Sequence, residues 1–96
     1  MVSLDWVPVQ NPAVVGRLVG DEAVLVLPLK GQVKVLNEVG ARIWSLMDGI
    51  RTVKEITTVI LDEFSTSEDE VMKDAQDFCE QLAEREIITF FKGIQS

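Results

Sequence analysis

Residues 36 to 56 read LNEVGARIWSLMDGIRTVKEI, and they decide the fold because they hold one complete helix, its stop signal and the start of another helix. Asn37 is a good N-cap residue, since its side-chain carbonyl can accept an unpaired N–H of the first helical turn. Apolar residues then recur at helical spacing, with Trp44 expected in the core. Gly49 can turn left-handed past a helix end without steric cost. We therefore predict a helix over about residues 38–48.

A second helix begins directly after this stop signal. Thr52 and Glu55 form a capping-box pattern, in which each side chain accepts the other residue's backbone N–H. The pattern predicts a helix over Val53–Glu63. Two helices joined by so few residues must turn sharply against each other, as in a helix-turn-helix.

A third helix is predicted from Ser67, which repeats the capping-box pattern with Glu70, to about Arg85. Its apolar residues fall within a narrow arc at about 100° per residue, which indicates a core stripe. The residues of this stripe are Val71, Ala75, Phe78 and Leu82. One flank holds small or uncharged residues, namely Met72, Gln76, Cys79 and Ala83, whereas the opposite side is acidic.

Three short strands are predicted before the helices. Residues 1–12 contain two prolines among valines and form an extended lead-in. Residues 13–19, Glu22–Leu27 and Gln32–Leu36 follow, separated by short turns, so they form an antiparallel meander. The middle run is apolar on both faces and is the central strand.

The last strand of this meander has alternating residues. Val33 and Val35 lie on one face and Lys34 on the other, as expected for a half-buried strand. Near the other end of the chain, residues 87–91 have strand propensity. Phe90 and Phe91 there either cap the core or mark an interface with a second copy or an enzyme, and we favour the interface.

Composition bounds the function. The 96 residues suffice for one domain, and the net charge of −7 argues against a nucleic-acid partner. Cys79 is the single cysteine, which fits a reducing compartment, and burial would make it inert. No run is long and apolar enough for a membrane span, and no secretory leader follows Met1. We expect a cytoplasmic protein that does not contact membranes.

Catalytic chemistry has little support in the residues. The chain has no histidine, which excludes Ser-His, Cys-His and His-metal arrangements. The acidic stretch from Asp62 to Asp74 fails the calcium-loop pattern, since Lys73 occupies the twelfth position. Gly16 and Gly20 do not follow phosphate-loop spacing. We predict no enzyme activity, no metal and no cofactor.

The residues within and around the stretch 36–56 also match the sequence pattern of a known family. It comprises residues 35–37, 40–44, 46, 48–49, 51–53 and 55–56, then Phe78, Leu82 and Arg85. Together with three strands before three helices, these residues resemble the PqqD-like family over about residues 24 to 88. The resemblance implies an α+β fold, a winged helix-turn-helix, in one peptide-recognition domain over residues 1–96. Such domains often have glycine after the third helix, where this chain has Glu86.

The resemblance also implies a non-catalytic function. Such domains bind the leader of a ribosomally made precursor peptide as a strand beside the third strand, against the third helix. They then present the peptide to a modifying enzyme, often a radical S-adenosylmethionine (SAM) protein. In the namesake pathway the product is pyrroloquinoline quinone. The peptide-binding residues that we predict are Gln32, Val33, Lys34, Val35 and Leu36 of the strand, with Met72, Gln76, Cys79 and Ala83 as the groove wall.

Chemistry supports this reading and leaves alternatives open. An edge strand offers unpaired N–H and C=O groups to an incoming chain, and the acidic rim of the third helix favours a leader that carries Lys or Arg. The alternatives are a winged-helix nucleic-acid-binding regulator, whose recognition helix should be basic, and a structural protein–protein interaction subunit. A homodimer also remains open. Arg42 and Arg51 either contact a partner or pair with carboxylates such as Glu38 and Glu55.

Overall fold

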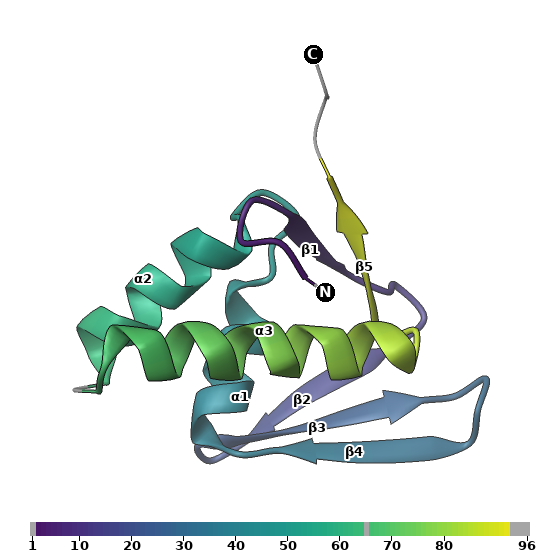
Figure 1. Ribbon diagram of the computed structural model, residues 1–96. Coiled ribbons are helices and arrows are strands. Elements are labelled where there is room, and N and C mark those ends of the chain that lie inside the picture. Colours follow the sequence, from purple (N-terminus) through teal and green to yellow (C-terminus); the bar gives the residue numbers. More distant parts are fainter. Residues whose placement is uncertain (1, 65, 93–96) are drawn as a thin grey trace.

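Two antiparallel sheets and three helices make up the described part of the computed structural model, residues 2–64 and 66–92 (Figure 1). The elements are β1 Val7–Gln10, β2 Val15–Val19, β3 Glu22–Leu27, β4 Gln32–Leu36, α1 Glu38–Leu46, α2 Val53–Glu63, α3 Glu68–Glu84 and β5 Ile88–Phe91. The predicted α+β fold, a three-stranded antiparallel meander followed by three helices, is confirmed. Among the described residues, no helix is long and apolar enough to cross a membrane.

The larger sheet has the strand order β2-β3-β4, so β3 is central, as predicted. Its core face buries Ala23, Leu25 and Leu27 under the helices. The predicted face of β4 was wrong, because Val33 and Val35 are 64 % and 59 % exposed, whereas Leu36 is buried. Alternation along a strand sets this outcome: once Leu36 enters the core, the residues of the other parity must point outward.

The junction of α1 and α2 matches its sequence signals. Asn37 caps α1, where its side-chain oxygen accepts the N–H of Gly40 at 2.9 Å. The helix ends at Leu46, two residues before the predicted end, and Gly49 has φ 80°. Thr52 and Glu55 form both bonds of the predicted capping box. Trp44 is 6 % exposed, which confirms its place in the core.

The core stripe of α3 differs by one residue from the prediction. Val71, Ala75 and Leu82 are buried, but Cys79 joins them at 1 % exposure while Phe78 is only half-buried. Both residues lie within the same turn of the stripe, so helical spacing alone does not choose between them. The small cysteine occupies the centre, and the bulky Phe78 lies at the edge of the core.

The second sheet pairs the two ends of the chain, a contact that the sequence did not predict. β1 runs antiparallel to β5, with Val7 opposite Phe91 and Gln10 opposite Ile88. The segment before β1 also accepts the N–H groups of Val53 and Lys54 through the carbonyls of Trp6 and Leu4. These are unpaired donors of the first turn of α2, so the extended lead-in completes the cap of that helix.

Candidate functional site

An open groove of about 530 Å³ lies between the free edge of β4 and the exposed side of α3. β4 supplies one rim, α1 the floor and α3 the opposite wall. The lining residues are Lys34, Val35 and Leu36 of β4, Asn37, Val39, Gly40 and Ile43 at α1, and Asp74, Asp77, Phe78 and Gln81 of α3. The groove therefore runs beside a strand edge, with residues of three elements around it.

β4 is an edge strand among the described residues. It pairs with β3 on one side only, from Leu27 opposite Gln32 to Ala23 opposite Leu36. Backbone N–H and C=O groups along its other side therefore have no strand partner in the described structure, and they face the groove. An incoming strand could form main-chain hydrogen bonds there.

Close packing of Gly40 on Phe78 shapes the floor of the groove. A Cβ atom at Gly40 would lie 3.5 Å from Phe78 Cε1, and 3.3 Å from Asn37 Oδ1. The Phe78 ring therefore lies in van der Waals reach of α1, at the edge of the core. Ile43 is buried beneath it. The floor is therefore apolar and suits hydrophobic side chains of a bound chain.

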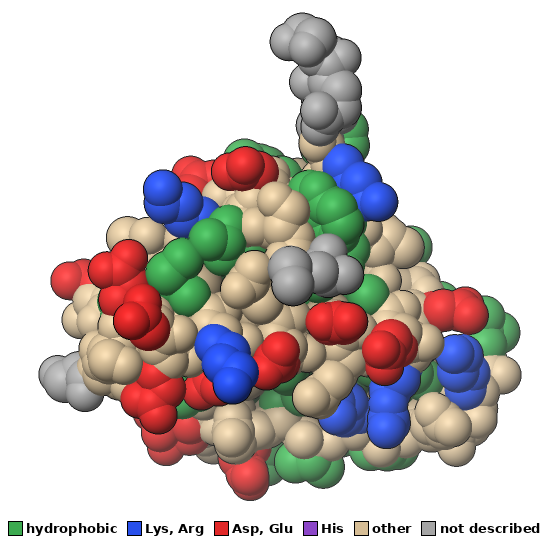
Figure 2. Space-filling model, viewed as in Figure 1, with side chains coloured by type: hydrophobic (Ala, Val, Ile, Leu, Met, Phe, Trp, Pro, Cys, Tyr) green, Lys and Arg blue, Asp and Glu red, His purple; other side chains and the backbone are tan. Residues whose placement is uncertain are grey.

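The wall of the groove on α3 is acidic. α3 contains seven acidic residues and one lysine, and the carboxylates follow the length of the helix (Figure 2). Asp74 and Asp77 lie within the groove lining, opposite Lys34 on β4. An apolar floor between an acidic wall and one basic side chain favours a ligand with positive charge on the side toward α3. No group of three or more His, Cys, Asp or Glu residues in the described ranges could hold a metal ion.

The structure brings together only part of the predicted site. Lys34, Val35 and Leu36 line the groove, and Gln32 and Val33 continue the same strand. The residues that line this groove on α3 do not include the predicted wall residues Met72, Gln76, Cys79 and Ala83. Cys79 lies in the core and the other three lie on the flank of α3 that faces away from β4.

The chain's own N-terminal segment lies against the flank of α3 that holds Gln76. Gln76 Nε2 donates to the carbonyl of Val2 at 2.8 Å, and a separate hollow lined by residues 2–5, Lys54 and Gln76 lies on that flank. Burial raises the pKa of the Cys79 thiol to about 12, so little reactive thiolate forms near neutral pH. The predicted burial of Cys79 is confirmed.

Sequence reasoning missed the groove residues of α1 and most of those of α3. The acidic side of the third helix, which includes Asp74 and Asp77, was predicted only as a rim of the groove, and Val39, which is 38 % exposed, was not among the predicted binding residues. Gly40 gives only a weak signal, because a Cβ atom there would lie at an ordinary van der Waals distance, 3.5 Å, from Phe78 Cε1.

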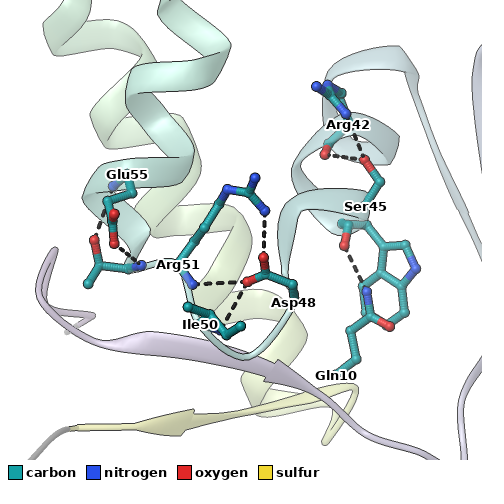
Figure 3. A network of polar contacts seen from close by, with 9 residues as sticks. Gln10, Arg42, Ser45, Asp48, Ile50, Arg51 and Glu55 are labelled. Atoms are coloured by element: carbon teal, nitrogen blue, oxygen red, sulfur yellow. Dashed lines mark hydrogen bonds and ion pairs between the residues drawn. The ribbon is translucent and has the colours of Figure 1, made fainter.

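The two arginines of the helix junction pair within the chain. Arg42 forms a two-pronged contact with Glu63, with both N···O distances at 2.7 Å, and the bonds lower the pKa of the Glu63 carboxyl. Arg51 pairs with Asp48, whose other oxygen accepts the N–H groups of Ile50 and Arg51 (Figure 3). The carboxylates are therefore Glu63 and Asp48, not the predicted Glu38 and Glu55. These contacts hold the helices and their junction.

Comparisons with known proteins agree with this geometry. The family model described as "Coenzyme PQQ synthesis protein D (PqqD)" matches residues 22–88. A solved structure, "TbiB1 in Complex with the TbiA(beta) Leader Peptide", is similar with a TM-score of 0.76 and 34 % sequence identity. The similarity covers 92 % of this chain and 99 % of that one. Among curated proteins, none matches the sequence significantly.

Proposed function

Because this chain belongs to the PqqD family, we propose that it binds the leader segment of a ribosomally made precursor peptide as an added strand along β4. The single observation that carries the proposal is the groove between the unpaired edge of β4 and the wall of α3. The similar structure is of TbiB1 in complex with a leader peptide, which supports the same class of ligand here.

Strand addition explains how such a site would work. Main-chain hydrogen bonds to β4 supply affinity for any extended segment, while alternate side chains enter the groove and set specificity. One set of side chains would pack on Ile43 and Phe78. Basic side chains would approach Asp74 and Asp77, so a leader that carries Lys or Arg is favoured.

Under this proposal the chain is a carrier of the precursor peptide. It acts as one peptide-recognition domain in the cytoplasm, without catalysis or a cofactor of its own, and presents the bound precursor to a modifying enzyme. We propose that this modifying enzyme belongs to the radical SAM class. A nucleic-acid partner is disfavoured by the acidic third helix, since phosphate contacts require clustered Lys and Arg.

A homodimer remains a prediction. Phe90 packs against Trp6 of the same chain, with ring centroids 5.3 Å apart, whereas Phe91 is 57 % exposed. Only Phe91 of this pair therefore remains available for the predicted interface. Sedimentation velocity of the wild-type chain and of Phe91→Ala tests this prediction directly.

A nitrogen–proton NMR titration tests the peptide proposal. The labelled chain is titrated with leader segments of precursor peptides encoded beside it, and with a short DNA duplex. We expect shifts confined to β4 and to the groove side of α3, with none from DNA. Val39→Glu places a charge in the apolar groove and should weaken leader binding at least tenfold.

The control distinguishes the groove from the flank predicted by helical angles. Met72→Glu lies on that flank and should leave the leader Kd within about twofold. If Met72→Glu weakens binding while Val39→Glu does not, the site lies on the other side of α3. Chemical-shift changes with the DNA duplex alone would favour the nucleic-acid alternative. If no peptide changed the chemical shifts, the proposal would be wrong.

A further inference from the structure

The outer face of the larger sheet is apolar and uncovered by any described element. All three helices lie on the other side of this sheet in Figure 1. Six valines, which we call the valine face, point outward from the three strands: Val15, Val19, Val24, Val26, Val33 and Val35. Three of these side chains are well exposed: Val19 by 60 %, Val33 by 64 % and Val35 by 59 %.

Charge sets this face apart from the rest of the molecule. The chain carries a net charge of −7, yet the outward positions of the three strands hold one acidic and one basic residue, Glu22 and Arg17. An apolar face of this kind on a small protein usually marks an interaction surface. A protein partner fits it, since nucleic acid would require clustered positive charge.

The size of the face argues against a second copy of this chain. Three strands of about five residues cover roughly 15 by 15 Å at ordinary strand spacing, which is a few hundred Å² at most. A stable interface buries about 800 Å² from each partner. Two copies would also bring together two net charges of −7. The face therefore needs a different partner and additional contact area.

A peptide bound along β4 would supply that area. An added strand continues the sheet by about 4.8 Å, and its alternate side chains then join the valine face instead of the groove. Val33 and Val35 of β4 would become an inner row between Val26 and Val24 on one side and the peptide on the other. The surface presented to a partner would then differ between the empty and the loaded chain.

From this continuity we propose that the valine face docks the enzyme that modifies the bound peptide, through an uncharged apolar surface of that enzyme. The inference rests on the proposed leader binding. The enzyme contacts the valines and the outward side chains of the leader together, so it binds the loaded chain in preference to the empty one. The carrier thus delivers its peptide selectively.

The test uses the precursor peptide and the modifying enzyme encoded beside this chain, with the full chain as carrier. Val15→Glu/Val26→Lys puts charge into the row of the valine face that also holds Val33. These positions are direct cross-strand partners, so opposite charges there support the sheet and protect the fold. Ile50→Glu, at a 79 % exposed residue of the α1–α2 junction, is the matched control.

We expect the enzyme to bind the loaded wild-type chain at least tenfold tighter than the empty chain. The double variant should bind the leader with an unchanged Kd, within twofold by fluorescence anisotropy, yet lose at least tenfold in kcat/KM for peptide modification. Ile50→Glu should resemble wild type in both measurements. Val15→Thr/Val26→Thr, which keeps the branched shape, should lose less than the charged variant.

Three results would overturn the inference. Full modification rates with the charged variant would show that the enzyme docks elsewhere. A wild-type dimer in sedimentation velocity that the variant abolishes would assign the face to a second copy. Absence of leader binding by the wild-type chain in the anisotropy experiment would remove the proposed function, and this inference with it; the other two outcomes leave leader binding intact.

Discussion

Glu86 is a non-glycine residue in a left-handed conformation, with φ 61°. It follows the last residue of the α3 cap, where Glu86 N–H donates to the Ala83 carbonyl at 3.0 Å and Ile87 N–H to the Leu82 carbonyl at 2.9 Å. This pair of bonds is the Schellman motif, and Leu82 and Ile87, both fully buried, form its apolar contact. The helix therefore ends as it would with glycine, at the cost of backbone strain.

Glu86→Gly should stabilise the chain. Relief of the left-handed strain favours the folded state by about 1 to 2 kcal/mol, and the greater freedom of glycine in the unfolded chain offsets about half of this. We expect a net gain of about 0.5 to 1 kcal/mol in the free energy of unfolding, measured by urea denaturation. Glu86→Ala keeps the Cβ atom and should show no comparable gain; equal gains from both variants would place the effect in the side-chain charge.

Sequence reasoning at the scale of single residues succeeded where the signal was local. Asn37, Gly49 and the Thr52–Glu55 pair act through neighbours within four positions, and all were predicted correctly. That Cys79 is buried in the core while Phe78 lies at its edge could not be predicted in this way. It depends on contacts with α1, which is far along the chain: the Phe78 ring lies near Gly40 and lines the groove beside it.

At the scale of elements, the junction of α1 and α2 depends on one carboxylate. Hydrogen bonds from the backbone N–H groups of Arg51 and Ile50, and then the charge of Arg51, hold the pKa of Asp48 below its ordinary value of about 3.9. A lowered pKa in the folded chain stabilises that chain above the ordinary pKa. This stabilisation is lost as the pH falls through the lower, folded value.

Asp48→Asn tests this pH dependence, because it removes the charge while keeping a similar shape and one acceptor oxygen. We expect a lower melting temperature than wild type at about pH 7, and a gap that narrows as the pH falls below the ordinary aspartate pKa of about 3.9 and through the lowered pKa of folded Asp48. Thermal unfolding followed by circular dichroism measures both. A gap of constant size across this range would contradict a role for the charge.

Element boundaries were predictable to within two residues, but the orientation of elements was less so. β4 was placed correctly, yet its valines were expected inside and lie outside. The period of two tells which residues share a face, and not which face meets the core. In the same way, helical angles did not show that the N-terminal segment lies against the flank of α3 that was predicted as the groove wall, where Gln76 donates to the Val2 carbonyl.

At the scale of the whole molecule, β1 and β5 join residues about 80 positions apart. Asn11 N–H donates to the Ile87 carbonyl at 2.9 Å, and alternation along the ladder then makes Val9 and Thr89 a hydrogen-bonded pair. Pro8 falls at a position that needs no N–H, opposite Phe90. This register explains how a strand tolerates a proline that had suggested only an extended lead-in.

Thr89→Pro should break this pairing, because it removes the N–H that Thr89 gives to β1. Since the Thr89 side chain is exposed, the loss reflects the backbone, and we expect at least about 1 kcal/mol of destabilisation in urea. Thr89→Val keeps the N–H and should be near neutral. An unchanged unfolding midpoint for Thr89→Pro would show that the pairing contributes little.

Pairing of the two chain ends also has a consequence for synthesis on the ribosome. Strand β1 emerges from the ribosome well before its partner β5. Until β5 is made, the nascent chain therefore carries an unpaired strand, and this part of the fold can close only after Phe91 has left the exit tunnel. The meander and the first two helices involve nearer neighbours and can form beforehand, so the pairing of β1 with β5 is a late step of folding during synthesis.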